Sequence, residues 1–167
     1  GEEVGSGSAG ESSAASAEEE KAQARESARK SGRAASAQSL ELAEYILVLT
    51  SLPSIAALDE TAEALAAKPR PGLILAEIST FPIDAKERAR DRLAAAGIVM
   101  LDCPLSGTGA QAVTGDLALY GSGDEAAFAR CREAFAGFAR VSHYLGAFGN
   151  SSRMKFVANL LVAVHNA

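Results

Sequence analysis

Short apolar runs alternate with longer amphipathic segments from Leu40 to the C-terminus, and this alternation is the feature that most limits the possible folds. Residues 45–50, YILVLT, form a continuous apolar run of strand length, and residues 73–78, LILAEI, form another. Continuous apolar runs are typical of parallel strands that helices cover on both faces. The pattern therefore predicts βαβ units and an open α/β sheet, in which ligands bind at the loops that follow the strands.

The remaining predicted elements continue this pattern. We expect further strands at 98–101, 117–120 and 141–145, and helices at 54–67, 82–96 and 124–138. Pro82 suits the first turn of a helix, and Gly97 suits the left-handed position that ends one. A final helix should begin near Ser151 or Ser152, because either side chain could cap it.

The first 39 residues differ in composition from the rest of the chain. Val4 is their only branched aliphatic or aromatic residue, so this stretch cannot bury much of a core. Opposite charges three or four residues apart at 18–30 favour a solvated helix within it. We therefore predict a low-complexity segment at 1–39, an open α/β domain at 40–150 and a final helix at 151–167.

Charge and composition narrow the expected partners. Sixteen Lys and Arg against 21 Asp and Glu give a net charge of −5, so no global field attracts nucleic acid or anionic lipid. No apolar run approaches the roughly 20 residues of a membrane span, and no secretory leader is visible. Cys103 and Cys131 form no C-x-x-C pattern, which argues against a disulfide framework and a zinc site. We expect a cytoplasmic protein that binds no metal, nucleic acid or membrane.

The last predicted helix places one Lys and one Asn within an apolar run, MKFVANLLVAV at 154–164. The i, i+4 spacing puts Lys155 and Asn159 on one face. A lysine held among apolar groups loses solvation, which favours the neutral amine and suits it to proton transfer or to polarising a substrate oxygen. The alternative is an ordinary amphipathic helix, in which Lys155 reaches solvent and Asn159 lies at the rim.

A second segment, CPLSGTGA at 103–110, follows a predicted strand and combines small residues with hydroxyls. Backbone N–H groups in such a loop can approach an anion such as a carboxylate. The loop lacks the G-K-[ST] ending of a nucleotide-binding P-loop, and its alternative is a Gly-rich connection into the next hairpin. Asp102 precedes Cys103 and should raise the pKa of its thiol, so we do not expect a catalytic thiolate there.

Together these segments resemble the β-hydroxyacid dehydrogenase family, which includes 3-hydroxyisobutyrate dehydrogenase and is related to 6-phosphogluconate dehydrogenase. DCPLSGT at 102–108 is similar to the family's D-A-P-V-S-G-G substrate loop, and GDL at 115–117 fits the G-x-L step that follows it. Residues 146–159 fit the pattern G-x-x-G-x-x-x-x-x-K-x-x-x-N. LTSLPS at 49–54 resembles a T-M-L-P stretch, and EIST at 77–80 resembles D-x-S-T.

The resemblance implies an NAD(P)-dependent oxidoreductase that transfers a hydride between a small 3-hydroxy acid and NAD or NADP. The implied catalytic residues are Lys155 and Asn159. The implied substrate-carboxylate site comprises Ser106, Gly107 and Thr108. The implied cofactor site is lined by Leu52, Pro53, Ser79 and Thr80.

The resemblance covers residues from about Gly32 to the end, which implies a partial fold. We expect the second half of a Rossmann-like domain, with a mostly parallel sheet and flanking helices, and then the start of an interdomain helix. Gly5, Gly7 and Gly10 have the G-x-G-x-x-G spacing, but they lack the buried strand before it and the apolar helix face after it. In the family an all-helical domain follows and usually forms a dimer, so a homo-oligomer is compatible with the resemblance. The alternative is a catalytically incompetent fragment or a non-enzymatic remnant of the family, and whether this chain is an enzyme stays open.

Overall fold

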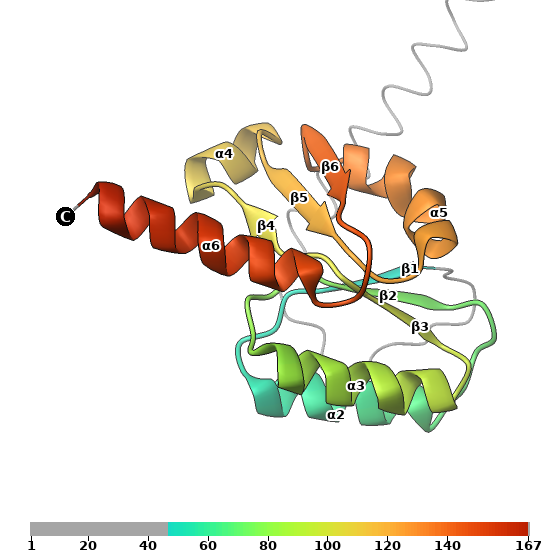
Figure 1. Cartoon of the computed structure of the whole chain (residues 1–167). Coiled ribbons are helices and arrows are strands. Elements are labelled where there is room, and N and C mark those ends of the chain that lie inside the picture. The colour runs from blue at the N-terminus through green and yellow to red at the C-terminus, as the bar shows by residue number, and fades with distance from the viewer. Residues whose placement is uncertain (1–46, 167) are drawn as a thin grey trace, which may run out of the picture. The chain divides into compact units, whose positions relative to one another are not determined.

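Three short parallel strands form one sheet in the order β1-β2-β3 (Figure 1). The computed structural model describes residues 47–166, so the predictions for 1–39 and for a helix at 18–30 lie outside the described residues. The strands are β1 at Leu47–Thr50, β2 at Ile74–Glu77 and β3 at Val99–Asp102. Their register places Thr50 opposite Glu77, and Glu77 opposite Asp102. The carboxyl ends of the three strands therefore lie in one row.

Helices cover both faces of this sheet. Figure 1 shows α2, Ile55–Ala66, and α3, Ile83–Ala95, side by side below the sheet, and α5, Glu125–Ala136, above it. Ser54 starts α2 by accepting a hydrogen bond from the Ala57 N–H at 3.2 Å. Asp124 starts α5 by accepting one from the Ala127 N–H at 2.7 Å. Such caps satisfy N–H groups that a helix leaves free at its N-terminus.

A second sheet has the order β4-β5-β6. Its strands are β4 at Leu105–Ser106, β5 at Ala118–Gly121 and β6 at Val141–Tyr144. β5 is antiparallel to β4 and parallel to β6. Asp102 and Ser122 form an antiparallel bridge, with backbone N···O distances of 3.0 and 2.9 Å. This bridge joins the end of β3 to the residue after β5.

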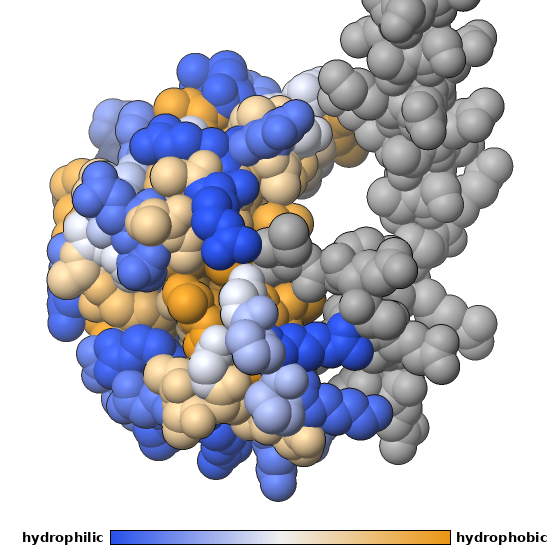
Figure 2. Space-filling model, turned by 90° about the vertical axis from the view of Figure 1, so that its right-hand side faces the viewer, coloured by the Kyte–Doolittle hydropathy of each residue, from blue (hydrophilic) through white to orange (hydrophobic). Residues whose placement is uncertain are grey.

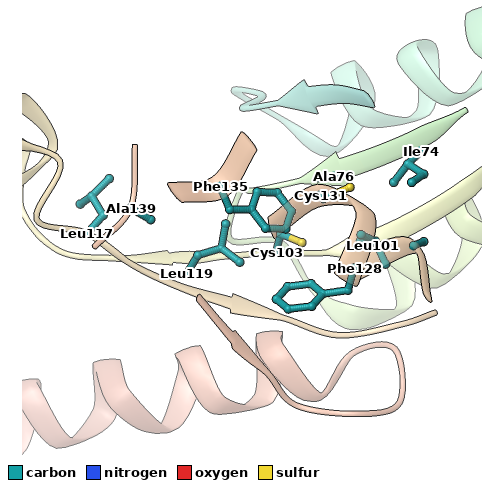
Figure 3. Packing of buried hydrophobic residues seen from close by; sticks show 11 residues of the cluster. Ile74, Ala76, Leu101, Cys103, Leu117, Leu119, Phe128, Cys131, Phe135 and Ala139 are labelled. Carbon is teal, nitrogen blue, oxygen red and sulfur yellow. The ribbon is translucent and has the colours of Figure 1, made fainter. Parts of the chain in front are cut away.

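The main core lies between α5 and the strands. Phe128 and Phe135 of α5 are fully buried, and their ring centroids are 5.5 Å apart. They lie near Leu101 and Leu119 from the two sheets (Figure 3). On one face of the molecule, hydrophilic side chains surround a smaller hydrophobic area (Figure 2), as expected when most apolar residues are inside. Both sheets thus share one core.

Most of the predicted strands and helices are confirmed within one or two residues. Gly97 has the expected left-handed conformation, with φ at +74°. The prediction for 103–115 was incomplete, because this segment contains β4 and a short helix, α4, at Gly109–Thr114.

The prediction that Ser151 or Ser152 caps the last helix is wrong. This helix, α6, spans Asn150–His165, and its N-cap is Gly149, with φ at +87° and no side-chain cap bond. Both serines are buried inside the first turn instead. In the described part of the chain, no helix is long and apolar enough to cross a bilayer.

Candidate functional site

The two predicted cofactor loops meet at the carboxyl ends of β1 and β2. Leu52 and Pro53 follow β1, and Ser79 and Thr80 follow β2. The Leu52 N–H donates a hydrogen bond to Ser79 Oγ at 2.7 Å, which holds the two loops together. Thr50 Oγ1 is buried at the end of β1 and has no hydrogen-bond partner among residues 47–166. These loops therefore offer hydroxyls at the sheet edge where open α/β folds bind ligands.

The predicted substrate loop is divided between a strand and a helix cap. Ser106 lies in β4 opposite Ala118 of β5. Thr108 is the N-cap of α4: its Oγ1 accepts from the Gln111 N–H at 3.3 Å, and its own N–H donates to Gln111 Oε1 at 2.9 Å. The Thr108 N–H and hydroxyl are thus used in a capping box. The capping box therefore engages the part of the predicted carboxylate site that lies at Thr108.

Lys155 and Asn159 lie one turn apart on α6, as the spacing predicts. Lys155 is half-buried and Asn159 is exposed. The apolar residues around them are largely exposed too, at 51% for Val157, 61% for Leu160 and 64% for Leu161. The apolar surroundings expected for Lys155 are therefore not supplied by residues 47–166.

The elements that carry these residues are neighbours. α6 packs against β3 and β5, and β5 pairs with β4, which holds Ser106. Figure 1 shows α6 running past this sheet toward the C-terminus. The structure thus joins the two cofactor loops by a hydrogen bond and places the lysine helix one strand away from the substrate loop.

A buried charged cluster, which the sequence analysis did not identify, lies at the same edge. It consists of Glu77, Lys86 and Asp102, each 0% exposed, and we call it the Lys86 cluster. Lys86 Nζ lies 2.8 Å from Glu77 Oε2, 2.8 Å from Asp102 Oδ1 and 2.6 Å from the Ser79 carbonyl oxygen. The ammonium donates hydrogen bonds to Asp102 Oδ1 and to the Ser79 carbonyl, whereas its contact with Glu77 Oε2 is an ion pair without a hydrogen bond. The cluster therefore holds one cation between two carboxylates without water contact.

Asp102 also receives the first turn of α6. Its Oδ2 accepts from the Ser152 N–H at 2.9 Å, and its Oδ1 accepts from Ser152 Oγ at 2.8 Å. The Ser151 N–H donates to Ser122 Oγ at 3.1 Å. A carboxylate at this end also interacts favourably with the helix dipole. The position of α6 is therefore set by Asp102 and Ser122.

One signal for Lys86 was present in the sequence. The buried residues of α3 include Ala89 and Leu93, which lie three and seven positions after Lys86. Residues at this spacing share a helix face. A lysine on an apolar face, next to a strand that ends in Glu77, is the pattern of a buried ion pair.

Cys103 is poorly suited to nucleophilic chemistry, as predicted. Burial, and after it the Asp102 carboxylate, raises the pKa of the Cys103 thiol well above its ordinary value. A buried thiol of this kind stays protonated and inert. No group of three or more His, Cys, Asp or Glu residues within 47–166 is arranged to hold a metal ion.

Comparison with known proteins identifies relatives of this domain. Residues 9–146 match the family described as the NAD binding domain of 6-phosphogluconate dehydrogenase. The chain is 35% identical over 107 residues to L-threonate dehydrogenase of Cupriavidus necator. The aligned residues make up 64% of this chain and 36% of that protein. It is 26% identical over 92 residues to the human cytokine-like nuclear factor N-PAC, covering 55% of this chain and 17% of that protein.

A solved structure supports the same relationship. The 3-hydroxyisobutyrate dehydrogenase of Mycobacterium tuberculosis, solved with L-serine, matches with a TM-score of 0.71 and 25% identity. The match covers 79% of this chain and 45% of that one. The chain thus spans about a third of the L-threonate dehydrogenase and less than half of the solved structure.

Proposed function

Because the chain belongs to the family of the NAD-binding domain of 6-phosphogluconate dehydrogenase, we propose that it is the part of an NAD(P)-dependent β-hydroxyacid dehydrogenase that binds the cofactor and carries the catalytic lysine. The family match and the relatives confirm the predicted resemblance, the Rossmann-like fold and the nicotinamide cofactor class. The substrate, the turnover and the residue roles below are our proposals.

The observation that carries this proposal is the Leu52–Ser79 hydrogen bond at the carboxyl ends of β1 and β2. It holds together the two loops expected to line the cofactor site, beside the buried hydroxyl of Thr50. These residues fit a nicotinamide dinucleotide, because Leu52 and Pro53 offer an apolar surface while Ser79 and Thr80 offer hydroxyls. When bound, the dinucleotide accepts or supplies the hydride.

Lys155 and the substrate loop would handle the hydroxy acid. Ser106 and Gly107, with Thr108 beside them, would bind the substrate carboxylate. Lys155 Nζ would hold the reacting hydroxyl and take or return its proton. Asn159, one turn further along α6, would orient the substrate against Lys155. The names of the relatives, which state threonate and 3-hydroxyisobutyrate, support a small hydroxy acid.

Titration calorimetry of the chain with NAD and with NADP tests the cofactor site. We expect saturable binding of at least one of the two, and Thr80→Val should weaken it by removing an exposed hydroxyl at the loop. Thr114→Val is the matched control, since Thr114 is also exposed but lies at the end of α4. A folded chain that binds neither dinucleotide would contradict the proposal for this chain.

Hydride transfer with small 3-hydroxy acids, followed by the absorbance of the reduced nicotinamide, tests the role of Lys155. Lys155→Ala should abolish transfer and keep dinucleotide binding, because Lys155 is assigned to the substrate. The exposed Lys68→Ala is the control. Transfer that survives in Lys155→Ala would rule out this role.

A second candidate is a non-enzymatic domain of the same family. The similarity to N-PAC, whose name describes a nuclear factor and states no oxidoreductase, favours it. Dinucleotide binding without turnover on any hydroxy acid would support this candidate. A cytoplasmic location, expected from the sequence, stays a prediction, and so does a homo-oligomer, which the family resemblance allows.

A further inference from the structure

An unbroken series of polar contacts connects the cofactor loops to the lysine helix. It begins at the Leu52 N–H, which donates to Ser79 Oγ at 2.7 Å. The Ser79 carbonyl accepts from Lys86 Nζ at 2.6 Å, and Lys86 Nζ donates to Asp102 Oδ1 at 2.8 Å. Asp102 then accepts from Ser152 in the first turn of α6. The series thus links the loops after β1 and β2, the end of β3 and the start of α6. The Lys86 side chain of α3 joins its two halves, because it contacts both Ser79 and Asp102.

The contacts around Ser79 fix both polar groups of its backbone. Its N–H donates to Glu77 Oε1 at 2.9 Å, and its carbonyl accepts from Lys86. Glu77 in turn lies 2.8 Å from Lys86 Nζ through its other oxygen. The loop that carries Ser79 and Thr80 therefore cannot shift without disturbing Lys86.

A role in stability alone does not account for this arrangement well. Apolar residues of similar volume are often as stabilising as a buried ion pair, because removing charges from water is costly. A charged cluster instead fixes the relative positions of the groups that it joins, because each hydrogen bond must keep its length and direction. Here the groups held in this way belong to the loop after β2 and to the start of α6.

We propose that Lys86 is a positioning residue that couples the cofactor loops to the helix carrying Lys155, through Ser79 on one side and Asp102 with Ser152 on the other. The functional meaning of this coupling rests on the function proposed above. Lys86 is buried and touches neither proposed ligand, so it acts through the two segments that it holds. Occupation of the cofactor loops and the orientation of Lys155 then become linked.

Residue-resolved amide hydrogen exchange on the whole chain, without ligand, tests the coupling. The probes are the amides of Leu52, Ser79 and Ser152. The Leu52 and Ser152 amides donate to partners in the series, and the Ser79 amide donates to Glu77 of the Lys86 cluster. The references are two amides outside the series. The Arg140 N–H donates to the Leu117 carbonyl just before β5, and the Leu145 N–H donates to the Gly121 carbonyl at the end of β5. Each probe's exchange rate is divided by the rates of the reference amides, which corrects for a change in the global stability of the domain.

Lys86→Met should accelerate exchange at all three probes by about tenfold or more relative to the references. Arg88→Met, on the same helix but exposed, should change no ratio. Acceleration at only one end of the series, or equal acceleration at probes and references, would overturn the proposal.

Ser152→Ala provides a second test if Lys86→Met does not fold. It removes only the Ser152 Oγ bond to Asp102, and it should accelerate the distant Ser79 and Leu52 amides by about threefold relative to the references. Unchanged exchange at Ser79 and Leu52 would overturn the coupling.

Adding saturating NAD or NADP separates this inference from the proposed function. In the wild type, the dinucleotide that binds should slow exchange at Ser152, and in a folded Lys86→Met variant it should not. A wild type that binds neither dinucleotide contradicts the proposed function, whereas the exchange ratios without ligand still decide whether Lys86 couples the two segments. Equal slowing at Ser152 in both proteins would overturn the coupling.

Discussion

Replacing Lys86 with methionine should destabilise the domain more than any surface change on α3. The Lys86 ammonium is 0% exposed and lies within 2.8 Å of both carboxylates of the cluster. Methionine fills much of the same volume but leaves Glu77 and Asp102 buried without a cation. Removing one partner of a buried pair costs about 3–5 kcal/mol, a large share of the roughly 5–15 kcal/mol that holds a domain folded.

Urea unfolding, followed by circular dichroism, measures this loss as a change in the free energy of unfolding. Arg88→Met is the control, and it should change stability by less than about 1 kcal/mol because its ion pair with Asp84 is exposed. Glu77→Gln combined with Lys86→Met should recover about 1 kcal/mol or more, since one uncompensated charge is removed. A loss below about 1 kcal/mol in Lys86→Met would refute the reasoning that both carboxylates depend on this cation.

Three further predictions concern other parts of the structure. Cys103 should resist thiol reagents at neutral pH in the folded chain and react once urea unfolds it, because burial raises the pKa of its thiol; mass spectrometry measures the labelling, and rapid labelling of the folded chain would contradict it. Gly121→Ala should cost about 1–3 kcal/mol in urea unfolding, since the new methyl group would overlap the buried Phe128 ring. Gly109→Ala is its control, because the new methyl group would meet no atom within 4 Å beyond its chain neighbours and the backbone of its own helix. Equal effects of the two changes would contradict the steric argument. Thr108→Ala should cost about 0.5–2 kcal/mol in the same assay because it removes the cap of α4, and an unchanged midpoint would count against the capping box.

Local patterns in the sequence were sufficient for most of the fold. The apolar run before Thr50 marks a strand, and Gly97 marks a helix end, because both signals arise from neighbouring residues. The burial of both faces that such a run predicts is not met at Leu49, which is 43% exposed. β4 and α4 were missed because two and six residues are too few to show a period.

The contacts that arrange the site depend on residues far apart in the sequence. Asp102 and Ser152 are 50 positions apart, so no local pattern reveals that the serine serves a distant carboxylate instead of capping its own helix. The position of Lys86 on the inner face of α3 could be read from spacing. Its acceptors could not, since they depend on how β2 and β3 align.

Because Asp102 and Ser122 hold the first turn of α6, a tilt of this helix would pivot about its N-terminal end. At 1.5 Å of rise per residue, Lys155 lies only about 4.5 Å along the axis from Ser152, whereas His165 lies about 20 Å from it. A tilt of about 10° at the fixed end would move the Lys155 backbone by under about 1 Å and the far end by more than about 3 Å. The proposed catalytic lysine therefore occupies the part of the helix whose position changes least when the remainder moves.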